Sequence, residues 1–301
     1  MKKADRLKEV KPSGIRAIFT IANEMRAKGQ RVIDFGLGDV NIGLPESVKK
    51  GIIDALNSGK STYGPDTGEP ALREALANRY NTIYGLDTHL GNTLVTCGAM
   101  ESLFDTFLAY LSPGDEVILH EPFFGNISHQ ITLAGGKTNI ILSDHENEFK
   151  LTSDMINEAV TPKTKMVLIN FPTNPTSMIL EHSDMKGIVE VCRDNNLLLV
   201  SDESYESLYY DGKKHVTALE FDYENTIMIS SVSKSLCMTG LRLGFTIGLN
   251  QEIMKPIFQI HQYNTVHASR PIQYGVIKGF EEEKQIIIST YFYNSFHIRV
   301  F

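Results

Sequence analysis

The sequence contains no tryptophan and only three cysteines, Cys97, Cys192 and Cys237. Because these cysteines are odd in number and far apart, they fit neither a disulfide framework nor a cysteine metal site. We expect small, reduced core residues. The nine histidines show no HExxH or comparable spacing, which predicts solvated or capping histidines and no bound metal.

The chain also lacks long apolar segments and clusters of one charge. No stretch is apolar enough to span a bilayer, and Met1–Arg6 is charged where a signal peptide would turn apolar. The formal net charge of -7 is spread along the chain, and no cluster of Lys and Arg marks a nucleic-acid surface. These absences predict a cytoplasmic protein with neither a nucleic-acid nor a membrane partner.

What is present is an alternation of helical and strand patterns. Residues 71–80 have apolar side chains at helical spacing, and a second helix is predicted near 103–111, before Ser112-Pro113-Gly114. Short, continuously apolar runs lie between the helical stretches, as expected for parallel strands covered on both faces. The pattern predicts an α/β fold with a largely parallel sheet. The predicted strands are 93–96, 117–119, 140–142, 166–169, 197–200, 226–229 and 245–247.

Several predicted strands are followed directly by polar residues or glycine. In open α/β sheets, ligands bind beyond the carboxyl ends of the strands. We therefore expect segments that are far apart in the sequence to converge on one site. The residues concerned are Gly98, Asn170, Asn174, Asp202, Ser231 and Lys234.

The segment from Ser231 to Gly244 carries a single lysine, Lys234, just past a predicted strand, with Arg242 further on. An amine flanked by phosphate-binding groups is what a Schiff base to a phosphorylated aldehyde requires. Alone, the lysine would be read as a surface residue and the arginine as an ion-pair partner. Together they resemble the lysine signature of the pyridoxal-phosphate (PLP) aminotransferases, class I/II of fold type I, the aspartate aminotransferase-like family.

This resemblance implies PLP as cofactor and a role for each residue of the segment. Lys234 would anchor the cofactor and then act as general acid and base, which requires a lowered pKa. Arg242 would hold the phosphate through paired, charge-assisted hydrogen bonds, and Ser231 would donate its hydroxyl to the same group. Ser233 either helps or only caps the following helix.

Two further segments complete the predicted ring site. Asp202 emerges from a buried strand, where a pyridinium N–H would satisfy its carboxylate; the alternative is a helix cap. Tyr205 would donate a hydrogen bond to the phenolic oxygen of the ring, or serve only in packing. Asn174, in a loop with two prolines, would present its amide to that oxygen and to a substrate carboxylate, or form an Asx turn. The family usually has glycine where this chain has Ser177.

Gly98-Ala99-Met100 lies between a strand and a helix. Free backbone N–H groups there would bind phosphate with the help of the helix dipole. Phe124 would stack on the cofactor ring, although core packing is an alternative and the register against Phe123 is open.

Tyr63 resembles the tyrosine that reaches the phosphate of the neighbouring subunit; by itself it would be a turn residue. Gly38 would offer a backbone N–H to the substrate. The family often follows that glycine with an acid and Pro-Asp-Phe, whereas this chain has Asp39-Val40-Asn41-Ile42, so the substrate-entry loop is expected to differ.

The resemblance extends from Pro12 to about Phe280. It implies an N-terminal arm and small-domain segment (1–35), a large PLP-binding domain (36–280) and a short tail (281–301) in place of a C-terminal small domain. It also implies a homodimer with shared active sites. The expected reaction transfers an amino group from an amino acid to a 2-oxo acid, with Lys234 moving the Cα proton.

The tail departs from the family, whose members continue into a domain with an arginine that binds the substrate α-carboxylate. Tyr291-Phe292-Tyr293 matches no family motif, and Arg299 is a poor substitute for that arginine. A shortened or frame-shifted gene product, or a fragment, would have this appearance. We expect weak substrate affinity. Three functions remain open: an active transaminase, a non-catalytic remnant that binds PLP and dimerises, and a related PLP lyase.

Overall fold

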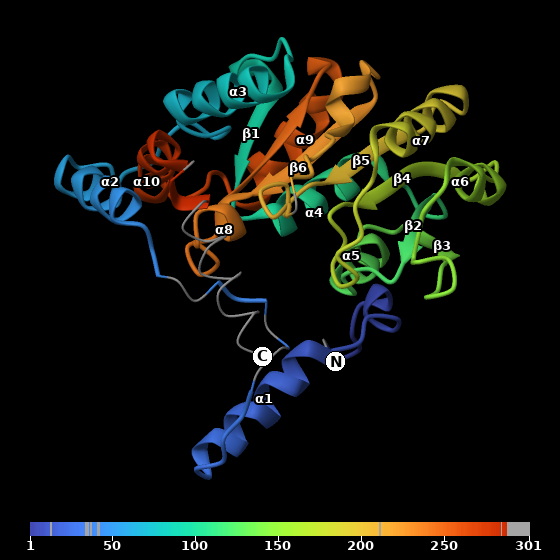
Figure 1. The fold of residues 1–301 in the computed structure, drawn as a ribbon, viewed down its shortest axis with the longest axis horizontal. Coiled ribbons are helices and arrows are strands. Elements are labelled where there is room, and N and C mark those ends of the chain that lie inside the picture. Colours follow the sequence, from blue (N-terminus) through green and yellow to red (C-terminus); the bar gives the residue numbers. More distant parts are fainter. Residues whose placement is uncertain are drawn as a thin grey trace.

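The protein is described by a computed structural model that covers residues 1–287 except 13, 34, 35, 37, 41, 42, 211 and 284. A seven-stranded sheet with the order β1-β7-β6-β5-β4-β2-β3 forms its centre (Figure 1). Every predicted strand corresponds to a strand of this sheet. The strands are β1 (Thr93–Thr96), β2 (Glu116–Glu121), β3 (Lys137–Leu142), β4 (Thr164–Asn170), β5 (Leu198–Asp202), β6 (Thr226–Ser231) and β7 (Gly244–Gly248).

The sheet is largely parallel, as predicted. Strands β2 to β6 pair in parallel, whereas β7 runs antiparallel to both of its neighbours, β1 and β6. Strand β1 therefore points the same way as β2 to β6. The carboxyl ends of six strands and the start of β7 consequently share one edge of the sheet, which is where ligands bind in such folds.

Helices cover both faces, and alternate strand residues point into different cores. One core joins residues such as Leu119 and Leu168 to helices α4 (Ala99–Tyr110), α5 (Asn126–Leu133) and α9 (Gln251–Asn264). The neighbouring residues Ile118 and Val167 instead face α6 (Ser153–Ala159) and α7 (His182–Asp194). A third core lies around β1 and β7 and includes apolar residues of α3 (Pro70–Tyr84), α2 (Glu46–Asn57), α8 (Val232–Ser235) and α10 (Arg270–Glu281).

Two sequence signals explain the limits of α3, the helix predicted over 71–80. Pro70 occupies its first position, where the missing N–H costs nothing. Gly85 ends it in the left-handed conformation, with φ 70°, and donates its N–H to the carbonyl of Asn81 at 2.9 Å. The helix extends the predicted range at both ends.

Strand β3 contradicts the expectation of strands covered on both faces. Only Ile141 is buried, while Ile140 is 40% and Leu142 71% exposed. The physical reason is position, since β3 forms the edge of the sheet and pairs with β2 alone. A continuous apolar run does not distinguish such an edge strand from a central one.

Helix α1 (Gly14–Ala27) stands apart from the sheet (Figure 1). It leaves Ile18, Phe19 and Ile21 exposed. Among the described residues, no helix combines the length and apolarity needed to cross a membrane. The described residues also form three short 3₁₀ helices, η1 (Asp5–Leu7), η2 (Leu90–Asn92) and η3 (Ala218–Phe221).

Helices α2 and α10 lie against each other in Figure 1 and approach closely through glycines. A Cβ atom on Gly51 would lie 3.0 Å from the Cα of Gly275. A Cβ atom on Gly275 would lie 2.6 Å from Ile52 Cγ1 and 3.0 Å from the carbonyl oxygen of Val48. The absence of side chains at these two positions therefore lets the helix backbones meet.

We predict that Gly275→Ala lowers the free energy of unfolding. Alanine favours a helix by about 1 kcal/mol over glycine, but overpacking of this contact costs about 1–3 kcal/mol and outweighs it. Urea denaturation followed by circular dichroism measures the difference. Gly14→Ala is the control, because nothing lies within 4 Å of a Cβ there. A Gly275→Ala protein as stable as the parent would contradict the close packing.

Candidate active site

Lys234 lies in α8, which begins immediately after β6. Its Nζ donates a hydrogen bond to the carbonyl oxygen of Gly38 and lies 5.8 Å from the centroid of the Tyr205 ring. Burial lowers the pKa of Lys234; the charge of Asp39 opposes that shift, and the positive charge of Arg242 adds to it. The lysine is therefore a half-buried amine that deprotonates more easily than a surface lysine.

Arg242 and the start of α4 meet in a corner next to this lysine. Gly98 is the N-cap of α4 with φ 88° and offers no side-chain cap, so the first N–H groups of the helix point outward. A Cβ on Gly98 would strike Nη2 of Arg242, and a Cβ on Gly244 would strike the backbone N of Ala99. The exposed guanidinium and a helix N-terminus are thus in contact, an arrangement suited to an anion.

Other residues of this corner have modest contacts. Met100 is the second residue of α4, and Ser231, the last residue of β6, is 6% exposed. Ser231 is also the N-cap of α8, without a side-chain cap bond. Ser233 lies inside α8, so the interpretation of Ser233 as its cap is wrong.

Asp202 ends β5 and is 8% exposed. Its Oδ1 accepts hydrogen bonds from the N–H of Ser204 at 3.1 Å and from its hydroxyl at 2.7 Å. Burial raises the pKa of Asp202 to about 6, with a further contribution from the charge of Glu203. Residues 204–207 form a turn, so Asp202 does not cap a helix there.

Hydrogen bonds join the asparagine loop to the end of β5. Asn174 Nδ2 donates to the hydroxyl of Tyr205 at 3.2 Å, and its backbone N–H donates to Asn170 Oδ1 at 3.1 Å. Asn170 Nδ2 in turn donates to the carbonyl oxygen of Asp202 at 3.0 Å. The Asn174 amide and the Tyr205 hydroxyl therefore meet, as expected for two groups that share one acceptor.

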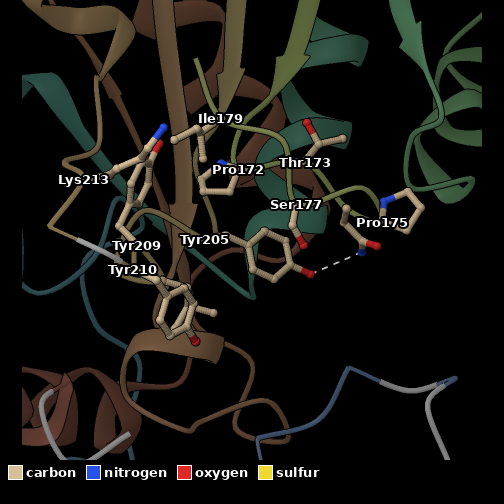
Figure 2. A pocket seen from close by; sticks show the side chains of 11 residues that line it. Pro172, Thr173, Pro175, Ser177, Ile179, Tyr205, Tyr209, Tyr210 and Lys213 are labelled. Atoms are coloured by element: carbon tan, nitrogen blue, oxygen red, sulfur yellow. Dashed lines mark hydrogen bonds between the residues drawn. The ribbon is translucent and has the colours of Figure 1, made fainter. Parts of the chain in front are cut away.

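A pocket of about 450 Å³ opens beside this pair (Figure 2). Tyr205, Tyr209 and Tyr210 supply aromatic walls, and Figure 2 shows the dashed hydrogen bond that ends on the Tyr205 hydroxyl. Lys213 lines the pocket and pairs with Glu181 at 3.3 Å. The other lining residues are Pro172, Thr173, Asn174, Pro175, Ser177, Ile179 and Leu208.

Two predicted residues lie away from the contacts described above. Phe124 is half-buried and packs against the core of α4 and α5, as does Phe123. Tyr63 is 85% exposed; its ring meets that of His267 edge-on at 5.7 Å, and its carbonyl oxygen accepts from Arg270 at 3.0 Å. Tyr291–Tyr293 and Arg299 are outside the described residues.

The prediction about histidines is wrong for three of them. His120 is 7% exposed, His261 is fully buried between Asp105 and Glu101, and the His215 side chain is 3% exposed against Glu203. Motif spacing could not find His215 and His261, because their acidic partners lie in other segments of the chain. His89, in contrast, caps η2 as expected for a capping histidine.

Asp39 was also missed as a site residue. It accepts a hydrogen bond from the Thr239 hydroxyl and places a negative charge near Lys234. The departure from the family pattern after Gly38 was the available signal.

Cys97 and Cys192 are free thiols, and burial raises the pKa of Cys97 to about 11 and that of Cys192 to about 12.

Comparison with known proteins places this geometry in a family. Residues 30–296 match the sequence profile of the family described as Aminotransferase class I and II. An aspartate aminotransferase of Geobacillus stearothermophilus is 36% identical over 283 residues, covering 93% of this chain and 72% of that protein. A probable aspartate/prephenate aminotransferase of Rhizobium leguminosarum bv. phaseoli is 34% identical, with 94% and 72% coverage.

Solved structures agree with the sequence comparison. The aspartate aminotransferase from Thermus thermophilus with maleate superposes with a TM-score of 0.92 at 29% identity, covering 96% of this chain and 76% of that one. The corresponding enzyme of Thermotoga maritima gives a TM-score of 0.90 at 30% identity. The chain therefore belongs to the class I and II aminotransferases, PLP-dependent enzymes that move an amino group between an amino acid and a 2-oxo acid.

Proposed function

We propose that PLP is held at the carboxyl edge of this sheet, with Lys234 as its covalent anchor. The observation that carries the proposal is the contact of Gly98 and Ala99 with Arg242 and Gly244, next to the lysine. Each proposed residue has one partner on the cofactor. Ser231, Arg242 and Gly98-Ala99-Met100 bind the phosphate, Asp202 the ring nitrogen, Asn174 and Tyr205 the phenolic oxygen, and Phe124 one face of the ring.

The described residues fit the three polar parts of this cofactor. A helix N-terminus beside a guanidinium suits a phosphate. A buried carboxylate whose two recorded hydrogen bonds both reach Oδ1 can accept a ring N–H on Oδ2. A half-buried amine with a lowered pKa suits an aldehyde.

When bound, PLP supplies an electron sink for the charge left at the amino acid's Cα after proton loss. Lys234 would take that proton at Nζ and return it to the carbon on the cofactor side of the transferred nitrogen. Burial and Arg242 keep this amine readily deprotonated, and the nearby carboxylate of Asp39 stabilises it once it is protonated.

We further propose aspartate as the amino donor, because the similar enzymes of Geobacillus stearothermophilus and Thermus thermophilus named above are aspartate aminotransferases. Asn174 would bind the substrate carboxylate through its amide. The Gly38 peptide would border the substrate, since its carbonyl already receives Lys234. The open pocket beside Asn174 provides room next to that position.

A homodimer is the proposed assembly. Its support is Tyr63, whose 85% exposed ring would be free to reach the phosphate in a second copy. We also propose the division into an arm with a small-domain segment (1–35), a large domain (36–280) and a tail (281–301); the exposure of α1 supports a separate arm. A cytoplasmic location is proposed as well, in keeping with the free thiols Cys97 and Cys192.

The first prediction concerns the anchor. Lys234→Ala should abolish the yellow absorbance of the PLP-bound protein, because it removes the half-buried amine that lies beside the Tyr205 ring and has a lowered pKa. Borohydride reduction followed by peptide mass mapping should place PLP on residue 234 of the parent. Lys255→Ala, a change at an exposed lysine paired with Glu252, is the control and should stay yellow. PLP trapped on another lysine would refute the assignment.

The second prediction concerns the phosphate. Gly98→Ala should weaken PLP binding at least tenfold, because the new methyl group displaces Arg242 from the start of α4. Gly114→Ala is a matched control: Gly114 has φ +99° and Gly98 has φ +88°, but nothing lies within 4 Å of a Cβ on Gly114. Equilibrium dialysis measures both affinities. Equal losses of PLP affinity in the two variants would mean that backbone strain causes the effect. That result would reject the proposed phosphate site at Gly98, Ala99 and Arg242.

The third prediction concerns the reaction. Aspartate added to the PLP-bound protein without a 2-oxo acid should bleach the yellow absorbance and release one oxaloacetate per site. The enzyme-linked assay of oxaloacetate, with ammonia and carbon dioxide measured alongside, separates transfer from a lyase reaction. Catalytic release of ammonia or carbon dioxide would indicate a lyase, and no product from any amino acid would indicate a non-catalytic protein.

A further inference from the structure

Glu203 and His215 form a buried acid–imidazole pair next to Asp202. Glu203 follows Asp202 in the chain, and its Oε2 is 2.7 Å from Nε2 of His215. The side chains are 0% and 3% exposed, respectively. Water therefore screens neither group, and their charges act on neighbours at close range.

The hydrogen bonds of Glu203 favour its carboxylate form. Its Oε1 accepts from the Ser201 hydroxyl at 2.8 Å, from the Thr217 hydroxyl at 3.1 Å and from the N–H of Ala218 at 3.0 Å. An oxygen with these donors carries no proton of its own. The remaining oxygen, Oε2, faces Nε2 of His215 at 2.7 Å, within hydrogen-bond distance.

Every described group facing His215 favours its charged form or is compatible with it. Burial alone would lower the pKa of His215, but the carboxylates of Glu203, then Glu206 and Glu220, raise it overall. On its other side, Nδ1 lies 3.1 Å from the hydroxyl of Tyr209, which can accept a hydrogen bond. The Tyr84 ring meets the imidazole edge-on at 6.2 Å.

Arg79, a cation close to Glu206, is already engaged. Arg79 pairs with Glu206 at 3.1 Å and with Glu283 at 2.7 Å. Asp202 and Glu203 are consecutive buried acids, and the negative charge of Glu203 disfavours a second charge on Asp202. Two such carboxylates require a cation beside them, and His215 is the one bonded to Glu203.

We propose that His215 is a positioning residue for the cofactor ring: as an imidazolium it cancels the charge of Glu203 and leaves Asp202 as the uncompensated acid of the consecutive pair Asp202 and Glu203. Asp202 then meets the ring nitrogen as a carboxylate, and the proton stays on the ring. This role rests on the proposed pairing of Asp202 with PLP. His215 itself touches neither the cofactor nor the reacting atoms.

Carboxyl NMR of the apoprotein labelled with ¹³C-aspartate tests the charge effect without PLP, and Asp202→Asn identifies the signal. His215→Gln should raise the titration midpoint of Asp202 by about one pH unit, because Glu203 is left uncompensated. Glu203→Gln/His215→Gln, which removes both charges, should restore the midpoint. Tyr209→Phe removes a hydrogen bond of His215 but no charge, and should leave it unchanged. An unmoved midpoint in His215→Gln, or no recovery in the double variant, would overturn the proposal.

The ring ¹⁵N chemical shifts of His215 provide a test on the parent protein, which does not depend on whether a variant folds. The parent protein should show an imidazolium at pH 7.5, and a neutral ring there would refute the proposal.

A measurement on the bound cofactor completes the test. With ¹⁵N-labelled PLP, His215→Gln should move the ring proton toward Asp202, and the double variant should move it back. If Asp202→Asn leaves the ring nitrogen unchanged, the pairing of Asp202 with PLP fails while the apoprotein titration still decides the role of His215.

Discussion

The arrangement of the site depends on the contact between the start of α4 and the segment that follows Lys234. Gly98 and Gly244 leave no side-chain atoms between the helix N-terminus and Arg242, so their backbones meet. That contact exists only because β7 turns back antiparallel between β1 and β6. Because β7 is antiparallel, its first residue lies at the carboxyl ends of its neighbours, and Arg242 just before it reaches the start of α4. A parallel β7 would begin at the opposite edge of the sheet.

Charge at this edge is divided between an accessible side and a buried side. Lys234, Arg242 and Asp39 lie where a ligand can reach them. On the buried side, Glu203 pairs with His215 and Glu206 pairs with Arg79, and these side chains are at most 12% exposed. Asp202 lies between the accessible side and the buried side, and its charge depends on residues of both. Burying a carboxylate without a partner costs free energy. The buried pairs Glu203–His215 and Glu206–Arg79 therefore determine the charge next to the accessible site.

The strands and the principal site residues could be predicted because both leave local signals. Apolar runs marked all seven strands, and Lys234, Asp202 and Asn174 each follow one of them. The edge position of β3 had no such signal, since exposure depends on which strand lies beside it. The buried roles of His215 and His261 were missed for the same reason: their carboxylate partners come from elements distant in sequence or from turns with no regular spacing.

The sequence by itself determined the α/β class, the order of the elements, the single lysine between β6 and β7, and the family resemblance. These features follow from local periodicity and residue chemistry. Only the tertiary structure decided the antiparallel direction of β7, the meeting of Asn174 with Tyr205, and the pairing of Glu203 with His215. Those contacts depend on how distant segments pack, and the cost of burying an unpaired charge selects among the possible packings.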